Sequence, residues 1–284
     1  MRFIPVLLFL ASLAHAQGPL DGYLKGKGVF NLVPNFSFNS ADRYFGAPGE
    51  TYDIPFNGNT LSVFGEYGLT EKIDLVATGA YVFTSVRSGL QDGGLFVKYR
   101  PIYHEFPKAG KLAVLFGTGI SFPLSDYEPT AEGAIGQKAM MAPLRLLLQW
   151  ELPFGLFLHA SGGYNIRFDE LKADDVAAIT ALRPDFNPEQ PPDHSTFLLK
   201  TGFPAKHFYV DGWVEWQKAY GGSDYAPGVP DLPQAYGVSY TQTGGTLYYS
   251  DNGRTGYILS GAYTFQGRNT SDVVRATLGM SFSF

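Results

Sequence analysis

Three side chains in the middle of the sequence are of the types that nucleophilic catalysis requires. His159 and Ser161 are two residues apart, and Asn165 follows on the same stretch. A serine becomes a nucleophile when an adjacent base takes its proton and a third group orients that base. The set could therefore carry hydrolytic chemistry if the fold brings the three side chains together on an accessible surface.

A second group of side chains is charged and could select or bind charged solutes. It is spread along most of the sequence and comprises Glu66, Asp74, Lys98, Arg100, Arg145, Arg167, Lys200, Asp211, Glu215 and Arg275. If the fold gathers these side chains in one interior, they can pair as ions across neighbouring strands. Alternatively they can line a channel, as charged rings do in ion pores. The sequence leaves both alternatives open, and the mixed signs leave ion selectivity undecided.

Acidic residues in two loops, 124–136 and 169–194, could attract divalent cations. Their spacing matches no calcium-loop signature. The sequence also contains no Cys, which excludes thiolate metal sites and disulfides. We therefore predict no metal site and no cofactor, and we interpret both loops as solvated.

The composition narrows the class of protein. A net charge of −5 argues against nucleic-acid binding. After residue 16, no stretch approaches the roughly 20 apolar residues that a membrane-spanning helix needs. The 34 Gly, 18 Tyr and 23 Phe are typical of a β protein with many tight turns and aromatic anchors.

Residues 1–16 have the pattern of a cleavable secretory signal. Arg2 supplies an early positive charge, residues 4–13 are apolar, and small residues flank His15. The apolar run is too short to span a bilayer. The pattern predicts export and cleavage before Gln17, which leaves residues 17–284 as the mature chain.

The C-terminal nine residues alternate strictly between two faces. One face carries Ala276, Leu278, Met280, Phe282 and Phe284, and the other carries only Thr, Gly and Ser. A soluble domain usually frays at its terminus. The pattern resembles the closing strand of bacterial outer-membrane β-barrels, whose terminal Phe and alternate hydrophobic residues are read by the barrel-insertion machinery. We expect Phe284, Phe282 and Met280 to form this assembly signal.

Eleven further segments show the same period of two. They cover residues 28–39, 61–69, 73–83, 94–100, 112–123, 144–150, 156–168, 196–203, 208–217, 246–250 and 255–265. Nearly all of them keep charge off the apolar face, and a closed barrel would satisfy every backbone group within lipid. The predicted fold class is all-β: a transmembrane, antiparallel, up-and-down β-barrel of twelve strands.

The connections between these strands alternate in length. The turns at residues 70, 151, 204 and 252 are short, and the connections that begin at residues 40, 124, 169 and 219 are long and polar. Short periplasmic turns and longer external loops are the expected asymmetry of such barrels. Two links break the rule, because 84–88 is short and 101–111 is long. Within the longest loop, residues 174–182 predict a short helix capped by Asp174 or Asp175.

Aromatic residues of the apolar faces fall near the two strand ends. Those near the short turns are Tyr67, Tyr99, Trp150, Phe208, Phe282 and Phe284, and those near the long loops are Phe38, Phe83, Phe122, Phe168, Trp216 and Phe265. Trp and Tyr prefer the membrane interface. Two belts that flank an aliphatic middle therefore favour a membrane barrel over a soluble sandwich.

The strand phase places the candidate side chains on inward faces. Lys200 should face Asp211 across the turn at residues 204–206. Leu147 should point into the lumen beside Arg145 and Gln149, where water or acidic partners could solvate an introduced arginine. The His, Ser and Asn set resembles that of outer-membrane phospholipase A, also a twelve-stranded barrel. In that enzyme the site faces lipid, so we predict that the inward set here is not catalytic.

Three stretches resemble a specific family. Residues 66–75 (EYGLTEKIDL), 93–101 (GGLFVKYRP) and 116–123 (FGTGISFP) are similar to outer-membrane channels of the phenol meta-cleavage pathway (the MetA-pathway of phenol degradation). That family is broadly similar to the long-chain fatty-acid and aromatic-hydrocarbon channels. The resemblance implies uptake of small aromatic or apolar solutes. Only residues 17–27 separate the signal from the first strand, so we expect no long N-terminal plug.

The sequence thus predicts a porin-like channel in the outer membrane of a Gram-negative cell, acting by passive uptake of small solutes and not as an enzyme. Its expected partners are outer-membrane lipid, the insertion machinery and a small solute. Two alternatives stay open: a barrel enzyme that acts on lipid, and a structural or surface-interaction barrel whose interior is filled by side chains.

Overall fold

The computed structural model describes residues 20–85, 87–127, 136, 138–168, 176–177, 180–181, 191–227 and 233–284. The predicted signal at 1–16 and most of both acidic loops lie outside these residues. Of the predicted helix at 174–182, Val176, Ala177 and Thr180 are helical, and most of the remainder is also outside the described part. No helix among the described residues is long and apolar enough to cross a membrane.

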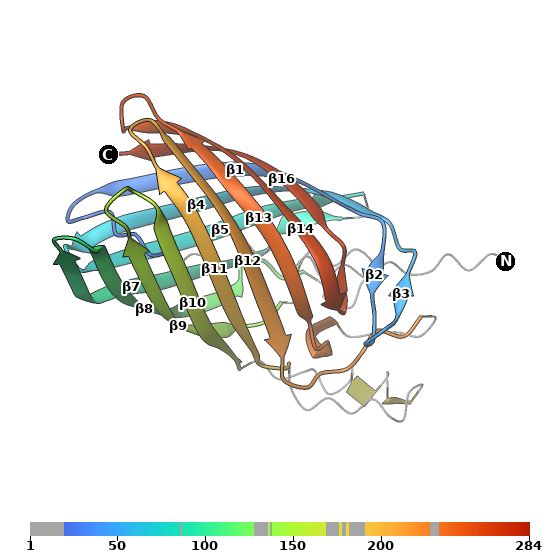
Figure 1. Ribbon diagram of the computed structural model, residues 1–284. Helices are drawn as coiled ribbons and strands as arrows, with labels where there is room; N and C mark the ends of the chain where they lie inside the picture. The colour runs from blue at the N-terminus through green and yellow to red at the C-terminus, as the bar shows by residue number, and fades with distance from the viewer. Residues whose placement is uncertain are drawn as a thin grey trace.

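Twelve long strands form one closed antiparallel barrel (Figure 1). They are β1 (Phe30–Ala41), β4 (Phe56–Thr70), β5 (Ile73–Thr84), β7 (Asp92–Phe106), β8 (Gly110–Pro123), β9 (Met141–Glu151), β10 (Phe157–Arg167), β11 (His194–Pro204), β12 (Phe208–Ala219), β13 (Ser239–Tyr249), β14 (Thr255–Arg268) and β16 (Val274–Ser283). Strand β1 pairs with β4 on one side and with β16 on the other, which closes the ring. The predicted fold class is confirmed.

The outer surface follows from the period of two. On β9, Leu144, Leu146 and Leu148 are exposed while Leu147 points inward and is buried. The outward aromatic residues that are exposed are Tyr67, Tyr99, Trp150, Phe208 and Phe284 near the short turns, and Phe38, Phe83, Phe168, Trp216 and Phe265 near the long loops. Phe122 and Phe282 are half-buried. Most members of both predicted belts thus lie on the outside of the barrel.

Several predicted boundaries were wrong, among them the start of the second strand, which is Phe56 instead of residue 61. The link at 101–111 is not a loop, because β7 runs to Phe106 and β8 begins at Gly110. The ladder is irregular between Tyr99 and Ile102, and this bulge accommodates Pro101, which has no N–H to donate. The predicted strand at 246–250 is longer, since β13 begins at Ser239 and its Gly244 and Gly245 pair with both neighbours.

Short elements build an outer cap at the long-loop end. Strands β2 (Tyr44–Phe45), β3 (Thr51–Tyr52) and β15 (Thr270–Ser271) form a separate sheet beyond the barrel (Figure 1). The other short elements are β6 (Ser88–Leu90), which pairs with β5, and the 3-10 turn η1 (Pro233–Ala235). Buried side chains of the cap form an apolar cluster of Ala41, Tyr44, Ile54, Phe56, Tyr225, Tyr236, Val238 and Tyr240.

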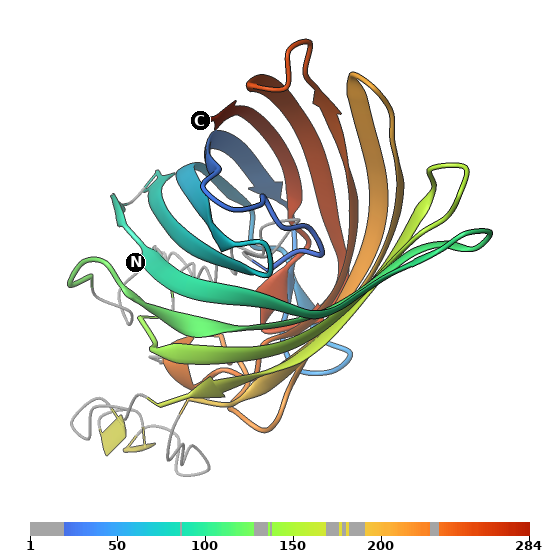
Figure 2. The ribbon, with the colours of Figure 1, turned by 90° about the vertical axis from the view of Figure 1, so that its left-hand side faces the viewer.

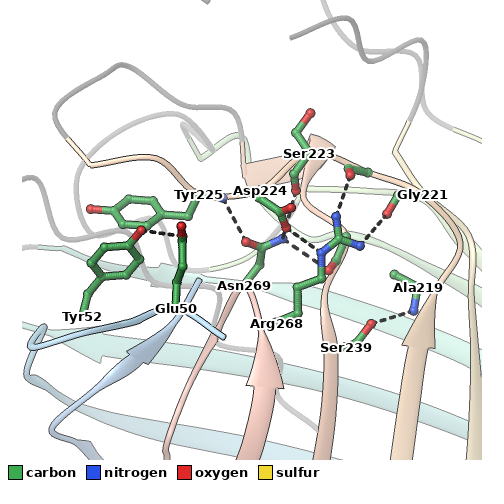
Figure 3. A network of polar contacts seen from close by, with 12 residues as sticks. Glu50, Tyr52, Ala219, Gly221, Ser223, Asp224, Tyr225, Ser239, Arg268 and Asn269 are labelled. Atoms are coloured by element: carbon green, nitrogen blue, oxygen red, sulfur yellow. Dashed lines mark hydrogen bonds and ion pairs between the residues drawn. The ribbon is translucent and has the colours of Figure 1, made fainter. Parts of the chain in front are cut away.

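A polar network ties the β12–β13 loop to this cap (Figure 3). Asn269 is fully buried, and its side-chain amide donates to Ser223 O at 2.9 Å and accepts the N–H of Tyr225 at 2.9 Å. Its φ of 52° is left-handed, a conformation that Asn tolerates. Arg268 donates to Asp224 and to Gly222 O. On β3, the hydrogen bond to Glu50 raises the pKa of Tyr52 to about 12.

Candidate functional site

Residues 20–25, called the inner segment below, precede β1 and lie inside the barrel. Figure 2, seen from the end at which the C-terminus lies, shows the first described residues within the ring of strands. Leu20 belongs to a buried apolar cluster with inward residues of β5, β7, β8 and β9, and Leu24 packs against it; the wall residues are Val76, Phe96, Ala113, Leu115 and Leu147. The lumen therefore contains a short N-terminal insertion, although no long plug was expected.

Gly22 lets the inner segment approach the wall closely. A Cβ on Gly22 would lie 2.8 Å from His159 Nδ1 and closer still to Gln149 Oε1. On the wall side, Leu20 sits over Gly117, where a Cβ would lie 2.7 Å from the leucine side chain. Glycine at both places removes the side chain that would hold the two backbones apart.

Ion pairs fix the inner segment to the strands. Lys98 is fully buried and pairs with Glu66 and with Asp21, the latter at 2.7 Å. Lys25 pairs with Glu66 at 3.3 Å, and its backbone N–H donates to Asp74 Oδ2 at 2.7 Å. Asp74 and Lys98 are cross-strand neighbours in the β5–β7 ladder, but the buried lysine reaches over β5 to Glu66 instead. The charges thus join three strands to the inner segment.

The charges around the inner segment favour the ionised form of the Asp21 carboxyl group. Burial alone would raise the pKa of Asp21, but the nearby ammonium groups of Lys98 and Lys25 outweigh burial and lower the pKa below its ordinary value. Asp21 therefore remains ionised, and it keeps its pair with Lys98 across the ordinary range of pH.

Arg100 does not join this network. Its guanidinium donates to Glu71 O at 3.0 Å and lies 4.7 Å from the ring centroid of Tyr103. The bulge that follows Tyr99 turns this part of β7 toward the turn between β4 and β5. Arg100 thus belongs to the rim at the short-turn end.

A second ion pair joins β11 and β12. Lys200 and Asp211 are two residues out of register in the β11–β12 ladder, and their side chains meet at 3.7 Å. Tyr209 donates to the same carboxylate at 2.7 Å. Its ring stacks on Phe157, which in turn meets Tyr23 of the inner segment edge to face.

The remaining predicted charges lie toward the long-loop end. Glu215 accepts hydrogen bonds from Tyr240 at 2.9 Å and from Gln242 at 2.8 Å. Arg145 donates to Asn165 at 3.0 Å. Two further arginines complete this group: Arg275 donates to Asn39 Oδ1 at 2.7 Å, and Arg167 lies near the mouth, where its backbone N–H donates to Asp193.

The candidate catalytic set is not assembled as a relay. Asn165 uses its side-chain oxygen for Arg145 and its side-chain N–H for His194 O, so it is engaged away from His159. His159 lies opposite Lys200 and Gln149 in the two adjoining ladders. The amide that would orient the base is thus committed to other groups.

We expect the purified protein to hydrolyse phospholipid no faster than a buffer blank, and Ser161→Ala to leave that rate unchanged. Ser260→Ala, another inward serine, is the matched control. Hydrolysis that is lost in Ser161→Ala but retained in Ser260→Ala would reverse this interpretation.

A cavity of about 500 Å³ lies between the inner segment and part of the barrel wall. Asp21, Gly22, Tyr23 and Lys25 line one side of it, and inward residues of β1, β4, β13, β14 and β16 line much of the other. Four of the predicted site residues border the cavity, namely Glu66, His159, Lys200 and Arg275. The other predicted site residues are not part of the cavity lining and make the contacts described above.

The architecture resembles solved outer-membrane proteins, although no protein-family model and no curated protein sequence matches the chain. An outer membrane channel from Pseudomonas putida F1 superposes with a TM-score of 0.68 at 12% identity, over 93% of this chain and 98% of that one. The NanC porin superposes with a TM-score of 0.56 at 11% identity, over 88% and 98%. The translocator domain of the autotransporter NalP from Neisseria meningitidis gives 0.50 at 14% identity, over 92% and 90%. The chain has an outer-membrane β-barrel fold.

The sequence interpretation missed the inner segment. Residues 17–27 had been considered only as the short separation between the signal and the first strand, and no role was assigned to Asp21, Gly22 or Lys25. The sequence did contain an indication of it, because three large apolar residues, Leu20, Tyr23 and Leu24, stand among charged ones in a stretch too short to form a core of its own. Such a stretch needs an apolar surface elsewhere, and the lumen wall provides it.

Proposed function

We propose that this protein is an outer-membrane, porin-like channel for the passive uptake of small solutes. The observation that carries the proposal is the cavity of about 500 Å³ beside the inner segment, inside a closed barrel whose outer face is apolar. A closed barrel satisfies its backbone groups in lipid, and an interior space offers a route through it. Export by residues 1–16 into a Gram-negative outer membrane belongs to the same proposal.

Small aromatic or apolar solutes are the proposed cargo. The resemblance of three strand-and-turn stretches to phenol-pathway channels supports this class. So does the aromatic group at the cavity, in which the partly exposed rings of Tyr23 and Tyr209 lie 6.5 Å apart, edge to face, and both contact the fully buried ring of Phe157. Stacked and edge-to-face rings present an apolar surface that an aromatic solute can contact.

Single-channel recording in planar bilayers tests the proposal. The refolded protein should give steady conductance steps. The buried side chains and the inner segment narrow the lumen, so we expect small steps. A bilayer that contains folded barrels but conducts no current would contradict the channel function and favour a filled structural barrel.

We further propose that the C-terminal strand directs assembly by the barrel-insertion machinery. Phe284 is 75% exposed, its ring stacks on Phe30 at 6.2 Å, and its backbone N–H donates to Phe30 O at 2.9 Å. Phe282 and Met280 precede it on the same outward face. The terminal ring is thus available to a partner even after the barrel has closed.

Phe284→Ala should lower the heat-modifiable folded fraction in outer membranes, because it removes the terminal ring but keeps the backbone bonds to β1. Phe208→Ala is the matched control, since it removes an exposed outward ring at the same end of another strand. Equal folded fractions in wild type and Phe284→Ala would count against the assembly signal.

A further inference from the structure

The two sides of the lumen differ in chemistry. Strands β5, β7, β8 and β9 present the apolar cluster inward together with the paired charges Asp74 and Lys98, and the inner segment covers both. The opposite side, called the polar wall below, consists largely of inward hydroxyl and amide side chains of β1, β4, β13, β14 and β16, with Val33, Phe64, Ile258 and Ala262 between them. Examples that line the cavity are Asn35, Ser37, Thr60, Ser62, Thr246 and Thr277. The inner segment thus leaves the hydrogen-bonding half of the lumen open.

The polar wall continues from strand to strand. Ser37 and Thr277 join β1 to β16 through a hydroxyl pair at 2.7 Å, and Ser281 donates to the hydroxyl of Tyr248 on β13 at 3.3 Å. A hydroxyl has one donor and two acceptor positions, so one neighbour does not exhaust it. A solute that moves along the wall can therefore exchange hydrogen bonds with water for hydrogen bonds with successive side chains.

Charges at the cavity occur in both signs and are engaged locally. Lys25 pairs with Glu66 at 3.3 Å, and Lys200 pairs with Asp211 at 3.7 Å. Arg275 donates to Asn39 Oδ1 at 2.7 Å. Pores that select ions use rings of one sign. A charged solute here would lose hydration and would have to compete with existing ion pairs, which is costly in a narrow interior.

We infer that the cavity conducts small uncharged solutes that carry hydroxyl or amide groups, and that the polar wall selects them. This inference rests on the proposed channel function and narrows its cargo to solutes with polar groups, which leaves out purely apolar ones. An aromatic solute would pass with its polar groups toward the polar wall and its ring toward Tyr23 and Tyr209. A solute without hydrogen-bonding groups would leave the polar wall unpaired along the route.

Swelling of proteoliposomes tests the inference with two probes of one carbon skeleton, the neutral sugar arabinose and its acid anion arabinonate. The test variant is the triple Thr60→Val, Thr246→Val and Thr277→Val, which removes three hydroxyls of the polar wall and keeps the branched shape. The control is the double Thr78→Val and Thr264→Val. These threonines are also inward, on β5 and β14, but do not border the cavity.

Wild type should admit arabinose faster than arabinonate. The triple variant should admit arabinose about fivefold more slowly, roughly the effect of one lost neutral hydrogen bond, while the control variant keeps the wild-type rate. Potassium chloride conductance, recorded on the same preparations, reports whether the lumen is open.

The outcomes separate the two proposals. Absence of conductance in wild type would remove the channel function, and the inference with it. If conductance is present but arabinonate enters as fast as arabinose, the inference is wrong while the channel function stands. The same holds if the triple variant admits arabinose at the wild-type rate.

Discussion

Replacing Lys98 by methionine should destabilise the barrel by about 3–5 kcal/mol, the cost of breaking a buried ion pair by removing one partner. The Lys98 and Glu66 side chains are both fully inaccessible, and Lys98 also contacts Asp21 and the Tyr23 carbonyl oxygen. Methionine fills a similar volume but leaves Glu66 buried beside only the partly exposed Lys25. The loss should therefore come from uncompensated charge and not from a cavity.

Reversible unfolding from lipid vesicles measures this effect. In the double variant Lys98→Met with Glu66→Gln, the buried carboxylate of Glu66 is gone and Asp21 is the only carboxylate that loses its partner, so the double change should cost less than the sum of the single changes. Lys111→Met is the control, because Lys111 and Glu105 form an exposed pair at 4.0 Å, and such pairs contribute about 0–1 kcal/mol. A Lys98→Met variant as stable as Lys111→Met would show that the network carries little of the stability.

The strand phase was predictable because each strand repeats its chemistry every second residue. Period two alone assigned Leu146 outward and Leu147 inward, and both assignments hold. The phase says which face a residue occupies, but not what lies opposite across the lumen. Leu147 was expected beside water and polar partners, and instead it is fully buried against a cluster that includes Leu20. That contact joins residues far apart in the sequence.

The charged candidate residues show the same limit of prediction from sequence: the strand face was predictable, but the interaction partner was not. Charges on neighbouring strands were expected either to pair across the ladder or to line a channel, and Lys98 and Asp74 do lie opposite each other in register. Their actual partners depend on the inner segment, which brings Asp21 to Lys98 and Lys25 to Asp74. Pro101 misled the boundary prediction for another reason, since proline usually ends a strand, whereas here a bulge absorbs it. Local rules therefore placed the strands, and tertiary contacts decided the pairings.

Arginine substitutions at the neighbouring residues Leu146 and Leu147 should produce two different defects. Leu146 is 51% exposed in the middle of the outward face of β9. If that face meets hydrocarbon, Leu146→Arg should cost roughly 2–4 kcal/mol in unfolding from vesicles, the penalty for a charge near the bilayer midplane. The conductance of the barrels that do fold should stay at the wild-type value, because the lumen is unchanged.

Leu147 is 0% exposed, so Leu147→Arg places a charge in the apolar cluster under Leu20. The guanidinium can reach water only if the inner segment moves away, and conductance should therefore increase. Leu147→Met and Leu146→Phe are the matched controls, since apolar changes of similar volume usually cost under about 1.5 kcal/mol. Higher conductance in Leu146→Arg, together with unchanged conductance in Leu147→Arg, would contradict the strand phase of β9. It would also contradict the place of the inner segment against that strand.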